Sequence, residues 1–187
     1  MSNNNFANPA PVGLLGFGMT TILLNLHNAG LYSLDAMILG MGVFFGGLAQ
    51  LIAGTMEFKK GNTFGQAAFM SYGAFWLLLV FLLLIPKVPA WAAFAPSEAA
   101  MVSFFVVWGI FTLFMWIGTW NSNRATQVIF LSLTILFFLL AARDYTGSKT
   151  IGTIAGIEGI FCGASAFYTA LAEILNEKMG KTFLPLG

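Results

Sequence analysis

Six long apolar segments dominate this chain and limit what it can fold into. A helix needs roughly 20 mostly apolar residues to cross the hydrocarbon core of a bilayer, and each segment comes close to that length between the charged residues that bound it. The segments span residues 12–28, 36–56, 64–85, 99–120, 125–142 and 151–175. We therefore expect an all-α membrane protein in which residues 1–187 form a single domain of six transmembrane helices, with no soluble domain.

The composition supports this fold class and excludes several functions. With 58% hydrophobic and only 8% charged residues, the chain has too little polar surface to coat a soluble globule. A net charge of +1 lacks the basic excess of a nucleic-acid binder, so no nucleic-acid partner is expected. One cysteine, Cys162, and one histidine, His27, cannot build a Cys/His metal cluster. We expect no metal and no cofactor.

The charged residues between the segments indicate an orientation in the membrane. If the amino terminus is cytoplasmic, five positive side chains lie inside and three outside. The inside set is Lys59, Lys60, Arg124, Lys178 and Lys181, and the outside set is Lys87, Arg143 and Lys149. The positive-inside rule favours this arrangement. It places both termini in the cytoplasm.

Neutral polar side chains interrupt the apolar segments and indicate a polar path. In hydrocarbon each such group needs a hydrogen-bond partner, and several facing inward together build a route for a polar solute. The candidate pathway residues are Asn8, Thr20, Gln50, Thr112 and Asn121. For a single threonine, a bond to the backbone of its own helix is the simpler explanation, whereas Asn and Gln need other partners.

Glu158 is the one acidic residue placed well inside a segment. A carboxyl group at such a position can carry a proton, although a hydrogen-bonded structural acid explains the same residue. Ser165 lies in a Gly-Ala-Ser stretch similar to that of intramembrane serine proteases, but such catalysis needs a histidine base within reach of the serine. The only histidine, His27, falls near the end of another segment, so we expect no enzymatic activity.

Glycines recur at regular spacing in two of the segments. The last segment contains Gly152-x-x-x-Gly156 and Gly159-x-x-x-Gly163, and the second contains Gly42-x-x-x-Gly46. Small residues at this spacing let helix backbones approach closely. The close approach can occur within the helix bundle or between protomers.

The most specific motif precedes the first segment. Residues 8–14 read NPAPVGL and closely resemble the NPAPLGL signature of the acetate uptake transporter family, which includes succinate–acetate permeases. Val12 in place of leucine is the one departure. The signature residues are Asn8, Pro9, Ala10, Pro11, Gly13 and Leu14. Residues 71–76, SYGAFW, are similar to the aromatic motif in the third helix of that family, and the six segments match its layout over essentially the whole chain.

This resemblance implies transport of acetate and succinate, as small mono- and dicarboxylates, across a lipid bilayer. It implies a homo-hexamer in which each protomer has its own pathway, narrowed midway by a hydrophobic constriction that maps to Phe17, Tyr72 and Leu131. The short chain resembles a bacterial inner-membrane member of the family. Proton-coupled symport and an anion-channel-like mechanism both remain open.

Two other functions compete with carboxylate transport. The chain could conduct another small solute such as ammonium, or it could be a non-transporting membrane scaffold or sensor whose glycines serve only assembly. Neither alternative accounts for the NPAPVGL motif. The absence of Arg and Lys from the middle of every segment favours a path that binds an anion weakly, as rapid conduction requires.

Overall fold

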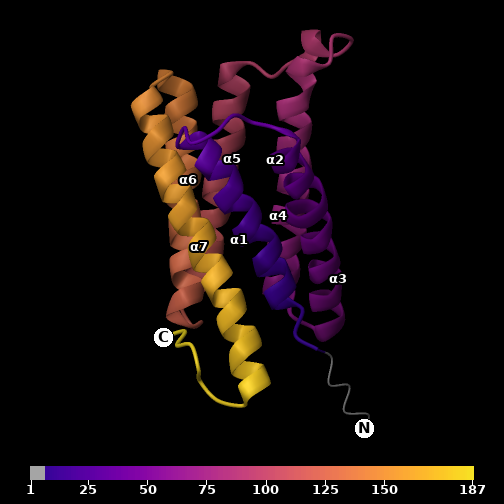
Figure 1. Cartoon of the computed structure of the whole chain (residues 1–187), viewed down its shortest axis with the longest axis vertical. Helices are drawn as coiled ribbons and strands as arrows, with labels where there is room; N and C mark the ends of the chain where they lie inside the picture. The colour runs from indigo at the N-terminus through magenta and orange to yellow at the C-terminus, as the bar shows by residue number, and fades with distance from the viewer. Residues whose placement is uncertain (1–6) are drawn as a thin grey trace.

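The computed structural model describes residues 7–187, which fold into a bundle of helices joined by short connections (Figure 1). The elements are α1 Ala10–Asn28, α2 Ala36–Gly40, the π-helix η1 Met41–Ala49, α3 Gln50–Lys60, α4 Thr63–Leu84, the 3-10 turns η2 Ile85–Lys87 and η3 Ala92–Phe94, α5 Glu98–Gly118, α6 Arg124–Thr146 and α7 Lys149–Met179. Because α2, η1 and α3 follow one another without a break, the described residues form six helices of membrane-spanning length. The predicted all-α class with six such helices is confirmed.

Several helix ends differ from the predicted segment limits. Helix α6 continues to Thr146, where the sequence predicts an end at residue 142, and α7 extends at both ends to span Lys149–Met179. Arg143 and Asp144 therefore belong to the last turn of α6. Charged side chains at a helix end can reach water from within the helix, so a charge is a poor marker of where a membrane helix stops.

Polar residues begin these helices and glycines end several of them. The N-terminal caps are Asp35 for α2, Asn62 for α4, Ser97 for α5, Asn123 for α6 and Ser148 for α7, each of which accepts a hydrogen bond from a backbone N–H in the first turn. Gly61, Gly147 and Gly180 follow α3, α6 and α7 with φ of 78°, 64° and 62°. These conformations suit glycine and terminate the helices.

Helix α1 crosses α7 at very short range on the face shown in Figure 1. A Cβ atom added to Gly163 would stand 2.7 Å from the carbonyl oxygen of Gly18, and one added to Gly18 would stand 2.8 Å from that of Gly163. The two backbones therefore touch where both residues lack a side chain. At this point the glycines serve packing within the bundle.

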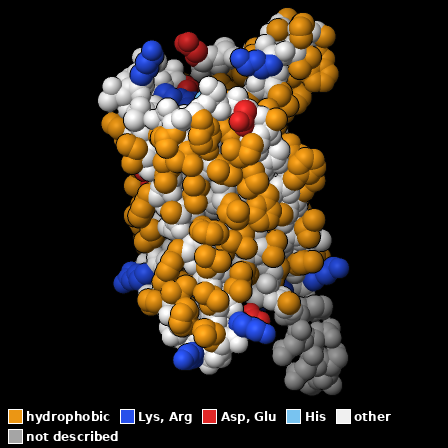
Figure 2. Space-filling view, in the orientation of Figure 1, with side chains coloured by type: hydrophobic (Ala, Val, Ile, Leu, Met, Phe, Trp, Pro, Cys, Tyr) orange, Lys and Arg blue, Asp and Glu red, His pale blue; other side chains and the backbone are white. Residues whose placement is uncertain are grey.

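The surface divides into an apolar middle and two charged ends (Figure 2). Large apolar side chains are exposed around the middle of the helices, among them Phe44, Val107 and Phe114. Exposed apolar surface of this extent suits contact with lipid. The beginning of α1 and the end of the chain lie at one end, which we call the terminus end (Figure 1). The last residue of α1, Asn28, and the residues Lys87 and Arg143 that follow or end α4 and α6 belong to the opposite end, which we call the vestibule end.

Candidate functional site

Three cavities follow one another inward from the vestibule end. The first, the vestibule, has a volume of about 750 Å³, and the second and third, the middle and inner cavities, have about 30 Å³ each. Asn28 lines both the vestibule and the middle cavity, and Phe17 and Leu133 line both the middle and the inner cavity. Because neighbouring cavities share lining residues, they lie in a row along α1, and we call this row the path.

Aromatic side chains and Leu133 narrow this path between the middle and inner cavities. The ring of Tyr72 lies 6.1 Å from that of Phe17 and 6.1 Å from that of Phe130, measured between centroids. All three rings are buried. The two smaller cavities each have room for about one water molecule. The path in this conformation is therefore too narrow for any solute much larger than water, and passage of such a solute would require these side chains to move.

The structure brings Phe17 and Tyr72 together as the sequence predicts, but it places Leu131 elsewhere. Leu131 is 40% exposed on the outer side of α6, whereas Leu133 is 4% exposed and lines the path. Residues two apart on a helix lie about 200° apart around its axis, so they cannot face the same cavity. Leu133 replaces Leu131 as the apolar residue beside Phe17 and Tyr72.

Two of the predicted pathway threonines support the path without lining the three cavities. Thr112 accepts a hydrogen bond of 2.9 Å from the Tyr72 hydroxyl and donates one of 2.7 Å to the carbonyl oxygen of Trp108. Thr20 donates to the carbonyl oxygen of Met41, the first residue of the π-helix, at 3.3 Å. Thr112 therefore orients the Tyr72 ring, and Thr20 bonds a backbone carbonyl of the neighbouring helix.

Tyr72→Phe should lower the free energy of unfolding by about 1 kcal/mol, because it removes one buried hydrogen bond. The ring remains in place, and Thr112 keeps its bond to Trp108. Thermal unfolding of the detergent-solubilised protein measures the change, with Tyr145→Phe as the control, since Tyr145 is exposed. An unchanged melting temperature would show that the bond between Tyr72 and Thr112 does not stabilise the fold.

Several buried polar atoms along the path have no hydrogen-bond partner in the described part of the chain. They are the hydroxyl of Thr21 and the indole N–H of Trp76, both on residues of the middle cavity, and the side-chain oxygen of Gln50, on a residue of the inner cavity. Leaving such a group unpaired costs about 1–3 kcal/mol. Water or a polar solute moving along the path would supply the missing partners.

Gln50 was among the predicted pathway residues, and Thr21 and Asn25 belong to the same set of neutral polar side chains inside the apolar segments. Trp76 was predicted only as part of the aromatic motif. The Asn25 side chain is buried beside the middle cavity, where its amide donates to the carbonyl oxygen of Thr21 at 2.9 Å and its oxygen accepts from the Asn28 amide at 2.9 Å. Thr21 and Asn25 lie one helical turn apart on α1. Their spacing of four residues was a signal available in the sequence.

Asn8 lies at the terminus end among charged side chains rather than in an open anion site. Its amide donates to a Glu173 carboxylate oxygen at 3.0 Å, and its oxygen accepts from the Lys60 ammonium at 3.0 Å. Nearby, the buried Glu57 accepts from the Asn62 amide at 2.7 Å. Asn8 thus connects the start of α1 to α3 and α7, and its participation in a substrate pathway stays a prediction.

The remaining signature residues place the beginning of α1. Pro9 and Pro11 are buried at the first turn, where proline suits the helix start. A side chain on Gly13 would collide with the Phe69 ring of α4, so glycine lets these two helices meet. Leu14 lines the inner cavity.

Two further predicted residues lie away from the three cavities. Asn121 is exposed in the turn between α5 and α6 and lines none of the three cavities, so its part in a substrate pathway stays a prediction. Glu158 of α7 is half-buried and accepts a hydrogen bond from Ser132 of α6, while its other carboxylate oxygen is buried without a partner among the described residues. Glu158 therefore bridges two helices beside the path.

Comparisons with known proteins agree with this architecture. The chain is 54% identical over 187 residues to the succinate-acetate/proton symporter SatP of Escherichia coli K12, covering 100% of this chain and 98% of that protein. It superimposes on the solved structure of the bacterial acetate channel SatP with a TM-score of 0.94 at 54% identity, covering 98% of this chain and all of that one.

A more distant relative has a different named solute. The chain is 34% identical over 181 residues to the ammonia transport outward protein 2 of Saccharomyces cerevisiae, covering 94% of this chain and 64% of the yeast protein. The model of the GPR1/FUN34/yaaH family matches residues 1–185. Because this match spans nearly the whole chain, the protein belongs to the GPR1/FUN34/yaaH family.

Proposed function

We propose that the protein transports acetate and succinate across a bacterial inner membrane, along the path formed by the vestibule and the middle and inner cavities. The observation that carries the proposal is the row of neighbouring cavities inside one chain, with an apolar constriction between two of them. Buried polar groups that lack a hydrogen-bond partner among residues 7–187 border this row. The Escherichia coli relative, named a succinate-acetate/proton symporter, supports the choice of substrates.

The residues along the path suit a small carboxylate. Thr21 and Trp76 present hydrogen-bond donors that can replace part of the water lost by a carboxylate, and neither is charged, so they hold it weakly. The constriction of Phe17, Tyr72 and Leu133 is apolar and excludes bulky solutes. Weak polar sites on either side of an apolar narrowing favour rapid passage over tight binding.

The proposal includes an orientation and an assembly. Lys59, Lys60, Arg124, Lys178 and Lys181 gather at the terminus end, and the three remaining positive residues lie at the vestibule end, which supports cytoplasmic termini. The family resemblance supports a homo-hexamer. Because residues of one chain line all three cavities, each protomer in such an assembly would contain its own path.

Uptake of radiolabelled acetate into proteoliposomes tests the function. We expect uptake above that of empty liposomes, and imposing a voltage and a pH gradient separately identifies the driving force. Uptake that follows voltage alone indicates an anion channel, and uptake that requires the pH gradient indicates proton-coupled or neutral-acid transport. No uptake above empty liposomes would refute carboxylate transport.

Ammonium is the second candidate solute because of the yeast relative. The vestibule argues against a cation, since Lys87, Arg143 and Lys149 oppose only two acidic side chains there. Excess unlabelled succinate should compete with labelled acetate, whereas ammonium chloride at the same ionic strength should not. Competition by ammonium alone would favour the second candidate.

Glu158→Gln should leave the response of acetate uptake to a pH gradient unchanged. Glutamine keeps an oxygen that can accept the hydrogen bond from Ser132, and Glu158 lines none of the three cavities. Uptake measured across a series of imposed pH gradients checks this, with Glu177→Gln, an exposed acid of the same helix, as the control. A flattened response in Glu158→Gln alone would support the proton-linked role predicted from the sequence.

A further inference from the structure

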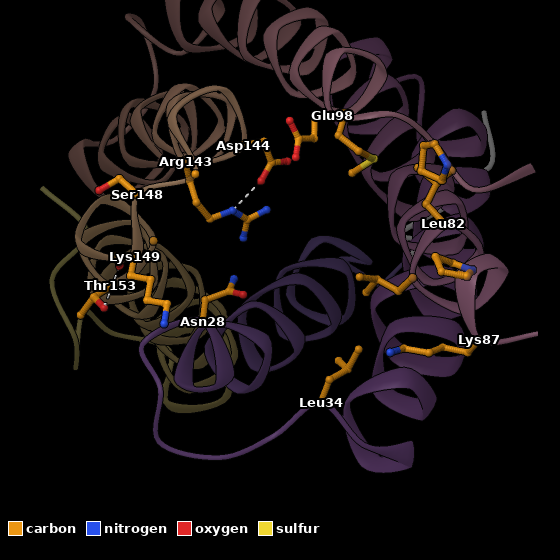
Figure 3. A pocket seen from close by; sticks show the side chains of 16 residues that line it. Asn28, Leu34, Leu82, Lys87, Glu98, Arg143, Asp144, Ser148, Lys149 and Thr153 are labelled. Atoms are coloured by element: carbon orange, nitrogen blue, oxygen red, sulfur yellow. Dashed lines mark hydrogen bonds and ion pairs between the residues drawn. The ribbon is translucent and has the colours of Figure 1, made fainter. Parts of the chain in front are cut away.

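The vestibule, which is the wide end of the proposed path, contains charged side chains to which the proposed function gives no individual role in binding a substrate. It is lined by residues from α1, α4, α5, α6 and α7 and lies at the vestibule end of the bundle (Figure 3). Lys87, Arg143 and Lys149 line it together with Glu98 and Asp144. Three positive side chains and two negative ones leave one net positive charge at the wide end of the path.

Arg143 is held in place by its surroundings. Its Nε donates to Asp144 Oδ1 at 2.7 Å, and its guanidinium carbon lies 6.0 Å from the centre of the Phe105 ring. A Cβ on Gly152 would stand 3.3 Å from the Arg143 side chain, so glycine at that position leaves room for the arginine stem. Contacts on several sides reduce the conformational entropy that the side chain loses on binding a ligand.

The two terminal amino groups of Arg143 form no hydrogen bond in the described part of the chain. The only hydrogen bond of this guanidinium within residues 7–187 is the one from Nε to Asp144, and Figure 3 shows the terminal nitrogens directed into the cavity. A guanidinium fork binds a carboxylate through two parallel hydrogen bonds. Arg143 therefore offers a preformed carboxylate-binding edge to the vestibule.

Lys149 and Asn28 border the cavity on the same side as Arg143, and Lys87 extends toward it from the opposite side (Figure 3). Asn28 also lines the middle cavity, so an anion held in the vestibule lies at the beginning of the narrow path. A second positive group beside Arg143 can pair with a second carboxylate. Two positive groups placed in this way would suit a dicarboxylate better than a monocarboxylate.

We propose that Arg143 and Lys149 form a recognition site for dicarboxylates such as succinate in the vestibule. The inference rests on the proposed function, because it names the site that selects between the two proposed substrates. Arg143 binds one carboxylate through its fork, and Lys149 attracts the other. Arg143 is partly exposed and Lys149 is exposed, which keeps the site weak, so that the ligand is released toward Asn28 and the path.

The test compares succinate with acetate in matched variants. The double variant Arg143→Gln/Lys149→Gln should raise the KM for succinate uptake about tenfold and that for acetate about twofold or less, because a dianion loses two ion pairs and acetate one. Arg143→Lys keeps the charge and loses the fork. Its KM for succinate should therefore lie between that of the wild type and that of the single variant Arg143→Gln. Lys178→Gln removes the same charge from α7 at the terminus end and should change neither KM.

Calorimetric titration of sodium succinate into the detergent-solubilised protein measures the site without transport. We expect the double variant to bind succinate about tenfold more weakly, while its size-exclusion profile stays that of the wild type. Equal changes in the KM for succinate and for acetate would overturn the site. The site would also be overturned if the wild type transports both substrates and the double variant binds and transports succinate as the wild type does. Absence of uptake by the wild type would instead reject the proposed function, and the binding titration would then decide on the site alone.

Discussion

Leu133→Ala is expected to raise the ratio of lactate to acetate uptake by about tenfold or more, since a single methylene in an apolar pocket already discriminates by about that factor. Leu133 is 4% exposed and lines both the middle and the inner cavity beside Phe17 and Tyr72. Removing its branched end widens the narrowest part of the path. Acetate, which is smaller, gains less from the added space than lactate does.

Leu131→Ala is the matched control for this experiment. It deletes the same atoms two residues earlier on α6, where the side chain is 40% exposed on the outer surface. We expect the wild-type ratio of lactate to acetate in proteoliposomes containing Leu131→Ala. If Leu131→Ala relaxed the selectivity and Leu133→Ala did not, the sequence-based assignment of the constriction would be restored and the path described above would be wrong.

The two leucines show why the sequence predicts this helix but not its inward face. A helix that packs on one side and faces lipid on the other is apolar all round. The pattern of apolar residues therefore does not show which face of the helix is turned toward the bundle. The run Ile129 to Leu133 contains only one polar residue, Ser132. Length and composition identify α6, whereas the choice of Leu133 over Leu131 depends on how α6 is rotated against its neighbours.

The same limit applies to the polar residues of α1. Thr20 and Thr21 are adjacent and about 100° apart on the helix, and the sequence does not show which of them borders the path. The structure assigns Thr21 to the middle cavity and bonds Thr20 to the neighbouring π-helix. Gln50 could be predicted more directly, because a glutamine amide in an apolar segment cannot form its hydrogen bonds to the backbone of its own helix as readily as a threonine hydroxyl can.

Residues far apart in the sequence form the vestibule, and this is why the sequence alone gave no indication of it. Lys87, Arg143 and Lys149 lie between the apolar segments or at their ends, and in the sequence they serve only to predict the orientation of the protein in the membrane. They meet because α4, α6 and α7 all end or begin at the vestibule end. Such a site depends on the relative placement of helices rather than on any local pattern.

Gly163→Leu should prevent correct folding, because it acts where α1 and α7 touch through their backbones. Even the first side-chain carbon would stand 2.7 Å from the carbonyl oxygen of Gly18 and 2.8 Å from the backbone nitrogen of Ile22. Backbone atoms cannot rotate away as a side chain can, so the helices must separate. The expected loss of stability exceeds about 4 kcal/mol, which is exceptional for one substitution and comparable to the whole stability of a typical domain.

The yield of monodisperse protein after detergent extraction measures this effect, and Gly40→Leu provides the control. Gly40 also lies in a helix, but within residues 7–187 no atom beyond the neighbouring turns of its own helix lies within 4 Å of the Cβ position there. We expect Gly40→Leu to keep a wild-type elution profile and Gly163→Leu to aggregate. Recovery of Gly163→Leu with normal thermal stability would mean that α1 and α7 can move apart without cost. The path along α1 would then not be fixed by its packing against α7.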